Sequence, residues 1–187
     1  MKEKFMKPFK RNLALIGLAV GIGMPLYASA DSSSDSTKAT GPTTVSKDDI
    51  EFLGKAAQAD MTEVQAATIA SSRALTTEAK SLATSAKTDH EVNNTDLRAI
   101  AATKGVVLPT RLDSKHQKEL DNLQKVDAKK FDAAYAEVVK DSHEDAVDLF
   151  EKTAKKSKDA DIQTYAKNTL PTLKQHLDMA KRLDEKS

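Results

Sequence analysis

Small and apolar side chains recur at steps of three and four residues along four long segments of this chain of 187 residues. This period is typical of α-helices that bury one face, and no segment of similar length alternates as a half-buried β-strand would. Four helices that each bury one stripe can do so by packing together. The sequence therefore predicts an all-α fold, a four-helix bundle. The clearest stripe lies near the C-terminus and consists of Ile162, Ala166, Thr169, Leu173, His176, Ala180 and Leu183.

Capping residues mark the ends of the four helices. Ser46 to Asp49 resembles a capping box, in which the serine oxygen accepts a hydrogen bond from a backbone amide and an acid follows three residues later. Thr76 or Thr77 can cap the second helix, and Gly105 can end it because glycine takes a left-handed conformation without strain. The predicted helices cover about 47–74, 77–105, 129–156 and 160–186, with Asp127 and Asp159 as caps of the last two.

The connections between the helices differ in length. The second and third helices are separated by VVLPTRLDSKHQKELDNLQKV, in which Ser114 to Gln117 forms another capping box that opens a short helix ending near Gln124. This connection is long enough to run up the side of the bundle. The other two connections are short turns, so we expect the helices that they join to be antiparallel.

The N-terminus has the three parts of a secretory signal peptide. A basic region up to Arg11 is followed by an apolar run from Leu13 to Met24 and by the small-residue site Ala28-Ser29-Ala30. The apolar run is too short to span a bilayer, which takes roughly 20 residues. We therefore expect cleavage after Ala30 and export of the mature chain to a bacterial periplasm, with no transmembrane segment left in it.

The mature chain begins with residues 31–45, DSSSDSTKATGPTTV, which lack the apolar area needed to offset the entropy of ordering. We interpret them as a flexible leader before a single domain at residues 46–187. The whole chain has 29 basic and 28 acidic residues, and cleavage removes five basic residues and one acidic residue. A slightly acidic domain lacks the positive surface that binds phosphates, so no nucleic-acid partner is expected.

One ionisable residue interrupts the apolar stripe of each helix, and all four lie near the middle of their helices. They are Glu63, His90, His143 and His176. Residues in the middle of a helix share one level of a bundle whichever way the helix runs. The sequence therefore predicts a polar layer of three imidazoles and one carboxylate at the waist of the bundle.

Three interpretations of this layer compete, because buried polar groups need partners. The first is a site for a divalent metal such as zinc, copper or iron, with Asp60, Asp89 and Asp141 near enough in sequence to be outer partners or extra ligands. The second is a metal-free network in which Glu63 pairs with a protonated histidine, for register or pH sensing. The third is a pocket that these groups line for another ligand.

Other potential ligands and nucleophiles have simpler explanations. His116 lies between lysines and is expected at the surface, while Met61 and Met179 are spaced like core residues. The chain has no cysteine, no glycine-rich phosphate loop and no G-x-S-x-G motif. A nucleophilic hydrolase is therefore not expected, and we name no catalytic residue.

Three blocks of the sequence resemble the exported bacterial proteins grouped as domain of unknown function 4142, which are often labelled predicted outer membrane proteins. The blocks are FLGKAAQADMTEVQAATIA, AKTDHEVNNTDLRAIAATKGVVLP and DAAYAEVVKDSHEDAVDLFEKTAKKSKDADIQTYAKNTLPTLKQHLDMAK. The family looks ferritin-like, which implies that the second and third helices run in the same direction. A di-iron site of that fold needs Glu-x-x-His on two helices. The residues three before the histidines are Lys87, Lys140 and Leu173, so di-iron chemistry is not expected.

Two hypotheses of function follow from the sequence. In the first, the protein is an exported monomer that binds or handles a divalent metal through Glu63, His90, His143 and His176. In the second, it is a non-enzymatic stress or interaction protein of the cell envelope, with an envelope protein as its partner and a structural or pH-sensing polar layer.

Overall fold

The computed structural model describes residues 45–186, and this part of the chain is helical with short connections. The predicted signal peptide, most of the predicted leader and Ser187 lie outside the described residues. None of the described helices is long and apolar enough to cross a lipid bilayer. The four long helices are α1 (Lys47–Arg73), α2 (Thr77–Thr103), α4 (Phe131–Lys156) and α5 (Ala160–Asp184).

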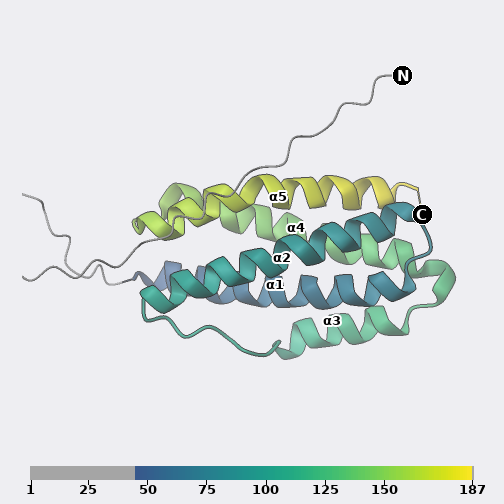
Figure 1. The fold of residues 1–187 in the computed structure, drawn as a ribbon, viewed down its shortest axis with the longest axis horizontal. Helices are drawn as coiled ribbons and strands as arrows, with labels where there is room; N and C mark the ends of the chain where they lie inside the picture. The colour runs from purple at the N-terminus through teal and green to yellow at the C-terminus, as the bar shows by residue number, and fades with distance from the viewer. Residues whose placement is uncertain (1–44, 187) are drawn as a thin grey trace, which may run out of the picture. The chain divides into compact units, whose positions relative to one another are not determined.

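The helices form a bundle of two antiparallel pairs, α1 with α2 and α4 with α5 (Figure 1). After α2 the chain returns along α1 through an extended connection and α3 (Ser114–Lys125), and it enters α4 through the 3₁₀ turn η1 (Ala128–Lys130). Helices α2 and α4 therefore run in the same direction, as the ferritin-like arrangement requires. The all-α four-helix fold expected from the sequence is confirmed.

The structure confirms the predicted N-cap residue of three of the five α-helices in the described residues. Ser46 accepts a hydrogen bond from the Asp49 amide, Thr76 from the Ala79 amide, and Asp159 from the Ile162 amide. Gly105 has a φ of 67° just after α2, which is the left-handed conformation expected there.

Two predicted caps were wrong. The short helix α3 is capped by Asp113, whose carboxylate accepts a hydrogen bond from the His116 amide. Ser114 is therefore the first residue of α3 and not its cap. The Asp127 side chain makes no capping bond, because the chain first passes through η1 and α4 begins only at Phe131.

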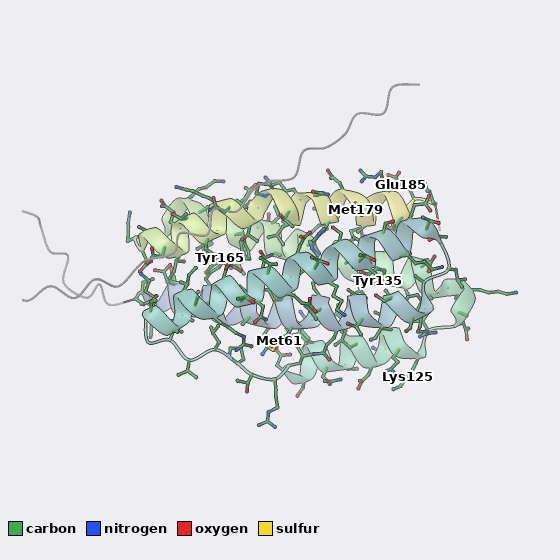
Figure 2. All side chains as sticks on the ribbon, viewed as in Figure 1. Met61, Lys125, Tyr135, Tyr165, Met179 and Glu185 are labelled. Atoms are coloured by element: carbon green, nitrogen blue, oxygen red, sulfur yellow. The ribbon has the colours of Figure 1, made fainter. Side chains whose placement is uncertain are left out.

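The apolar core is divided into two clusters by the middle of the bundle. One cluster surrounds Leu82 and Tyr135, and the other surrounds Phe52 and Tyr165. Figure 2 shows the two tyrosines on either side of the middle of the long axis. In the second cluster the rings of Phe52 and Phe150 meet edge to face with centroids 4.9 Å apart. The level between the clusters is where the polar layer was expected.

Helix α5 continues through Pro171 without interruption. Proline lacks an amide hydrogen, so the carbonyl of Lys167 loses its helical partner. Both residues are exposed, and the lost bond therefore lies on the solvent side of the helix. This explains how an apolar, core-facing helix tolerates a proline five residues before His176.

Long side chains of α1 fasten α3 and the preceding connection to the bundle. Gln58 donates to the Arg111 carbonyl at 3.0 Å and accepts from the Asp113 amide at 3.1 Å. At the other end Arg73 donates to the carbonyls of Leu123, Gln124 and Val126 at the end of α3. The position of α3 beside α1 and α4 is thereby fixed at both ends.

Asp132 joins the turn between α1 and α2 to the start of α4. Its buried carboxylate accepts from the Leu75 amide at 3.0 Å, the Thr76 amide at 2.8 Å and the Thr76 hydroxyl at 2.6 Å. Although burial opposes ionisation, these hydrogen bonds lower the pKa of Asp132 below its usual value. Because the folded state favours the ionised form of Asp132, this residue contributes stability at pH values above its pKa in the unfolded chain.

We predict that Asp132→Ala lowers the free energy of unfolding by about 1–3 kcal/mol near neutral pH. Because the folded-state pKa is depressed, the difference from the wild type should shrink as pH falls below about 4. Urea unfolding at several pH values measures both effects. The exposed Asp148 of α4 provides a control, and a loss from Asp148→Ala as large as that from Asp132→Ala would contradict this assignment.

Candidate metal centre

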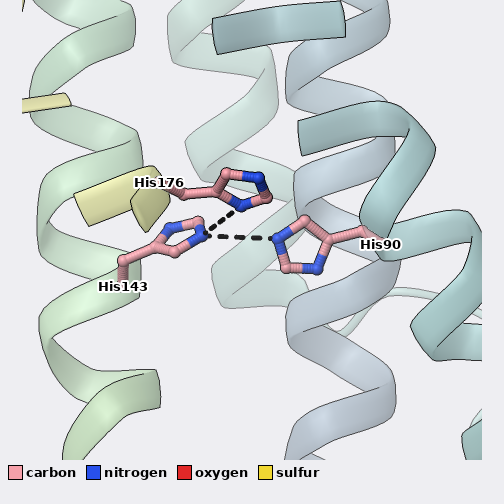
Figure 3. Close-up of side chains that lie close together, drawn as sticks. All are labelled: His90, His143 and His176. Carbon is pink, nitrogen blue, oxygen red and sulfur yellow. Dashed lines mark hydrogen bonds between the residues drawn. The ribbon is translucent and has the colours of Figure 1, made fainter. Parts of the chain in front are cut away.

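Three histidine side chains from three helices meet at the middle of the bundle (Figure 3). His90 comes from α2, His143 from α4 and His176 from α5, and each is 2% exposed or less. The three ring centroids are 5.3–5.5 Å apart, so the rings form a nearly regular triangle. One nitrogen from each ring points toward the others, and these ligand atoms all lie within 4.8 Å of one another.

The inner nitrogens are His90 Nε2, His143 Nε2 and His176 Nδ1. His143 Nε2 lies 3.4 Å from His90 Nε2 and 3.3 Å from His176 Nδ1. These separations are long for nitrogen hydrogen bonds, whose usual length is about 2.9–3.0 Å.

The outer nitrogen of each ring faces an oxygen that can only accept. His90 Nδ1 lies 2.7 Å from Asp60 Oδ1, and His176 Nε2 lies 3.0 Å from Asp89 Oδ2. His143 Nδ1 lies 2.9 Å from the carbonyl oxygen of Val139. An ionised carboxylate and a carbonyl have no proton to give, so this geometry favours hydrogen on each outer nitrogen, although burial raises the pKa of Asp60.

This arrangement of protons leaves the centre without a donor. A neutral imidazole has one N–H and one lone pair, and here the outer nitrogens hold the N–H groups. The three inner nitrogens therefore turn their lone pairs toward one another. Such a centre is stabilised by a positive charge placed between the rings, either a metal ion or a proton.

Glu63 lies outside the triad, on the other side of His143. Its Oε1 atom is 3.5 Å from His143 Nδ1 and accepts a short hydrogen bond from the Ser142 hydroxyl. Glu63 is 1% exposed, and its Oε2 atom has no hydrogen-bond partner among the described residues. The structure thus buries all four residues of the expected layer, but it places Glu63 next to a ring and not among the inner nitrogens.

Of the three aspartates expected near the layer, Asp60 and Asp89 contact histidines, whereas Asp141 is exposed. His116 lies away from the triad and pairs with Asp113 at 2.8 Å. Met179 packs against the apolar cluster around Leu82. Met61 is partly buried and lines a surface hollow (Figure 2).

Two hydroxyl groups of the site were not expected from the sequence. Ser142 holds Glu63, and the Ser85 hydroxyl donates to Asp89 at 3.2 Å while lying 3.3 Å from His176 Nε2. Serine is frequent throughout the chain, so only the spacing Ser85–Asp89, one helical turn, could have indicated a role.

The surroundings of the rings shift the pKa values of two histidines in opposite directions. Burial lowers the pKa of His176 to about 4, and the neighbouring His143 and His90 add to this effect. Burial also disfavours a charged His90, but the hydrogen bond to Asp60 and the charges of Glu63, Asp60 and Asp89 outweigh it and raise its pKa. A proton bound at the centre is therefore favoured on His90 and disfavoured on His176.

The model of a protein family described as "Domain of unknown function (DUF4142)" matches residues 34–183 of the chain. The chain belongs to this family. The match spans the whole bundle, including the three histidines, and the resemblance seen in the sequence blocks is confirmed. No curated protein matches the chain.

Among solved structures, the DUF4142 chain is similar to a DUF305 fragment from Deinococcus radiodurans. The TM-score is 0.67 and the sequence identity 11%, with 76% of this chain and 99% of the fragment covered. At this identity the similarity shows a shared helical fold and nothing about the function.

In the metal-free protein we expect His176 to titrate with a pKa of about 4 and His90 to titrate above the usual 6.5. A histidine whose folded pKa is lowered reduces stability as pH falls below 6.5, whereas a raised pKa adds stability that is lost as pH rises through it. NMR titration of the chelator-treated, folded protein measures both values. A His176 that is protonated at pH 5.5 would contradict the expectation.

Proposed function

We propose that this protein binds one divalent transition-metal ion between His90 Nε2, His143 Nε2 and His176 Nδ1. The observation that supports the proposal is the convergence of three buried ring nitrogens whose rings are each held from behind by an acceptor. Imidazole rings that bind a metal are usually oriented in this way by a carboxylate or carbonyl on the other nitrogen.

Two of the three separations between the inner nitrogens agree with tetrahedral coordination. Zinc–imidazole bonds of roughly 2.0–2.1 Å at tetrahedral angles separate the ligand atoms by roughly 3.3–3.4 Å. The separations from His143 Nε2 are 3.3 and 3.4 Å. The third separation, between His90 Nε2 and His176 Nδ1, is within 4.8 Å, and a bound metal ion would bring it to the same spacing.

The chemistry of the ligands limits the choice of metal. Neutral imidazole suits zinc, copper, iron and nickel, whereas calcium and magnesium prefer oxygen. We propose zinc or copper ahead of iron, because no carboxylate oxygen lies among the inner ligand atoms. Three protein ligands leave a fourth position for a water molecule or another small ligand.

The burial of the triad supports a binding or storage role over catalysis. All three rings are 2% exposed or less, so a substrate cannot reach the centre without a rearrangement. We further propose that this binding occurs outside the cytoplasm, because residues 1–30 have the pattern of a secretory signal peptide.

We predict that the full-length chain takes up one equivalent of zinc, cobalt or copper, and that His143→Gln and His176→Gln each weaken binding by at least tenfold. Stoichiometry by elemental analysis and affinity by calorimetry measure this. At a free metal concentration of 100 Kd the wild type should gain roughly 2.7 kcal/mol of stability. Chelation should remove that gain.

His116→Gln is the matched control, because His116 also pairs with an aspartate but lies outside the triad. This variant should bind the metal as the wild type does. The proposal fails if the purified wild type takes up none of these metals, or if the triad variants bind as tightly as the control.

A second candidate function is a metal-free polar layer that fixes the packing of an envelope interaction protein. The raised pKa of His90, whose outer nitrogen contacts Asp60 at 2.7 Å, favours this alternative. A protonated His90 could donate from Nε2 to His143 and place a proton where the metal would lie.

The two candidates differ in their response to apolar replacement. If the layer is only structural, the combined change of His90, His143 and His176 to leucine with Asp60→Asn should leave the protein folded and of equal or greater stability, because well-packed apolar groups often replace buried polar groups without loss. Circular dichroism and urea unfolding, each with and without zinc, measure this. If the wild type gains stability only when zinc is added, that result contradicts the structural candidate.

A further inference from the structure

A cleft of about 920 Å³ lies between α1, α3 and α4, on the Glu63 side of the triad. Helix α1 contributes one face from Glu51 to Thr62, and α4 contributes the opposite face from Asp141 to Phe150. The third wall is the connection after α2 and the start of α3, which Gln58 holds in place. We call this hollow the α1–α3–α4 cleft.

The α1–α3–α4 cleft has a surplus of carboxylates. Its lining includes Glu51 and Asp113, which pair with Lys55 and His116. Three more acids of the lining have no ion pair of this kind within residues 45–186. They are Glu119, Asp141 and Asp145. Burial raises the pKa of the half-buried Glu119, and the charges of Glu63 and Asp141 add to the rise against those of His116 and Lys115, so these carboxylates lie close enough to repel one another.

The inner end of the cleft leads to a buried carboxylate with a free oxygen. Ser142 and Thr62 line the cleft, and the Ser142 hydroxyl donates to Glu63 Oε1 just behind this wall. Glu63 is 1% exposed, yet its Oε2 atom has no partner among the described residues. A buried carboxylate oxygen without a partner is costly unless a cation or water binds it.

The other polar residues around the triad offer no comparable approach. Asp89 is 41% exposed, but its Oδ2 atom is held by His176 and Ser85. Asp60 also has a buried oxygen without a partner, Oδ2, but Asp60 does not line the α1–α3–α4 cleft, and its Oδ1 atom is held by His90. The hollow beside Met61 is lined by a single acid, Glu91. On the Glu63 side, a large acidic cleft lies next to a ring of the triad.

We propose that the α1–α3–α4 cleft is the route by which a hydrated divalent cation reaches the triad, with Glu63 Oε2 as the first buried ligand on its way. The cleft carboxylates attract the cation, and Glu63 replaces part of its hydration shell. Imidazole nitrogens bind zinc and copper more strongly than one carboxylate does, so the ion moves on past the ring of His143. This inference rests on the proposed function.

The rate of metal uptake tests this route. The metal-free, full-length chain is mixed with Co²⁺ in a stopped-flow instrument, and the visible absorbance of the bound ion is followed. We expect Glu119→Gln combined with Asp141→Asn to slow association roughly threefold to tenfold at low salt, since carboxylates in a cleft steer cations. The difference should vanish near 0.5 M salt, where charges are screened beyond roughly 4 Å. Release into excess chelator should be unchanged.

Glu91→Gln combined with Asp96→Asn is the matched control, because it removes the same charge from exposed positions of α2 near His90. This control should load at nearly the wild-type rate. Equal slowing in both double variants, or none in the cleft variant, would overturn the route while leaving the metal site intact. A wild type that binds no Co²⁺, zinc or copper would refute the proposed function itself. Circular dichroism checks that every variant is folded.

Discussion

The middle of this bundle depends on the acceptors that hold the outer nitrogens of three buried imidazole rings. Asp60, Asp89 and the Val139 carbonyl each lie within hydrogen-bond distance of the outer nitrogen of one ring. The rings are thereby oriented, and their remaining lone pairs converge at one point. Lone pairs buried away from water are costly, so a proton or a metal ion between the rings would stabilise this centre. The same hydrogen bonds thus determine both the packing of the waist and the kind of ligand it can hold.

The sequence was sufficient to predict the period of the helical stripes, the ends of the helices and the residues at the waist, because each of these depends on local spacing. The stripe through His176 and the caps at Ser46, Thr76 and Asp159 follow from positions within one helix. The direction in which a ring nitrogen points depends on rotamers and on neighbouring helices. Sequence spacing therefore brought Glu63 into one set with the histidines, whereas the structure places it behind His143. The cap at Ser114 was wrong because Asp113, one position earlier, also caps a helix, and the cap at Asp127 was wrong because the 3₁₀ turn η1 precedes α4.

Alanine determines how closely the helices of this DUF4142 domain approach. Each histidine of the triad has a buried alanine one turn away on its own helix, namely Ala86, Ala146 and Ala180. Imidazole is a short side chain, so three rings can meet only where the helix backbones are near one another. The ferritin-like topology supplies four central positions, and small residues above and below them make room. The fold it shares with the DUF305 fragment provides the frame, but these residues provide the centre.

The long crossover through α3 has a consequence for the order of assembly. The pairs α1–α2 and α4–α5 are each joined by a short turn, so either hairpin can form from contacts that are local in sequence. His90 belongs to the first hairpin, and His143 and His176 belong to the second. The triad therefore comes into existence only when the two hairpins dock. Any ion that the triad holds therefore bridges the two hairpins. Removal of that ion would first weaken the packing of one hairpin against the other.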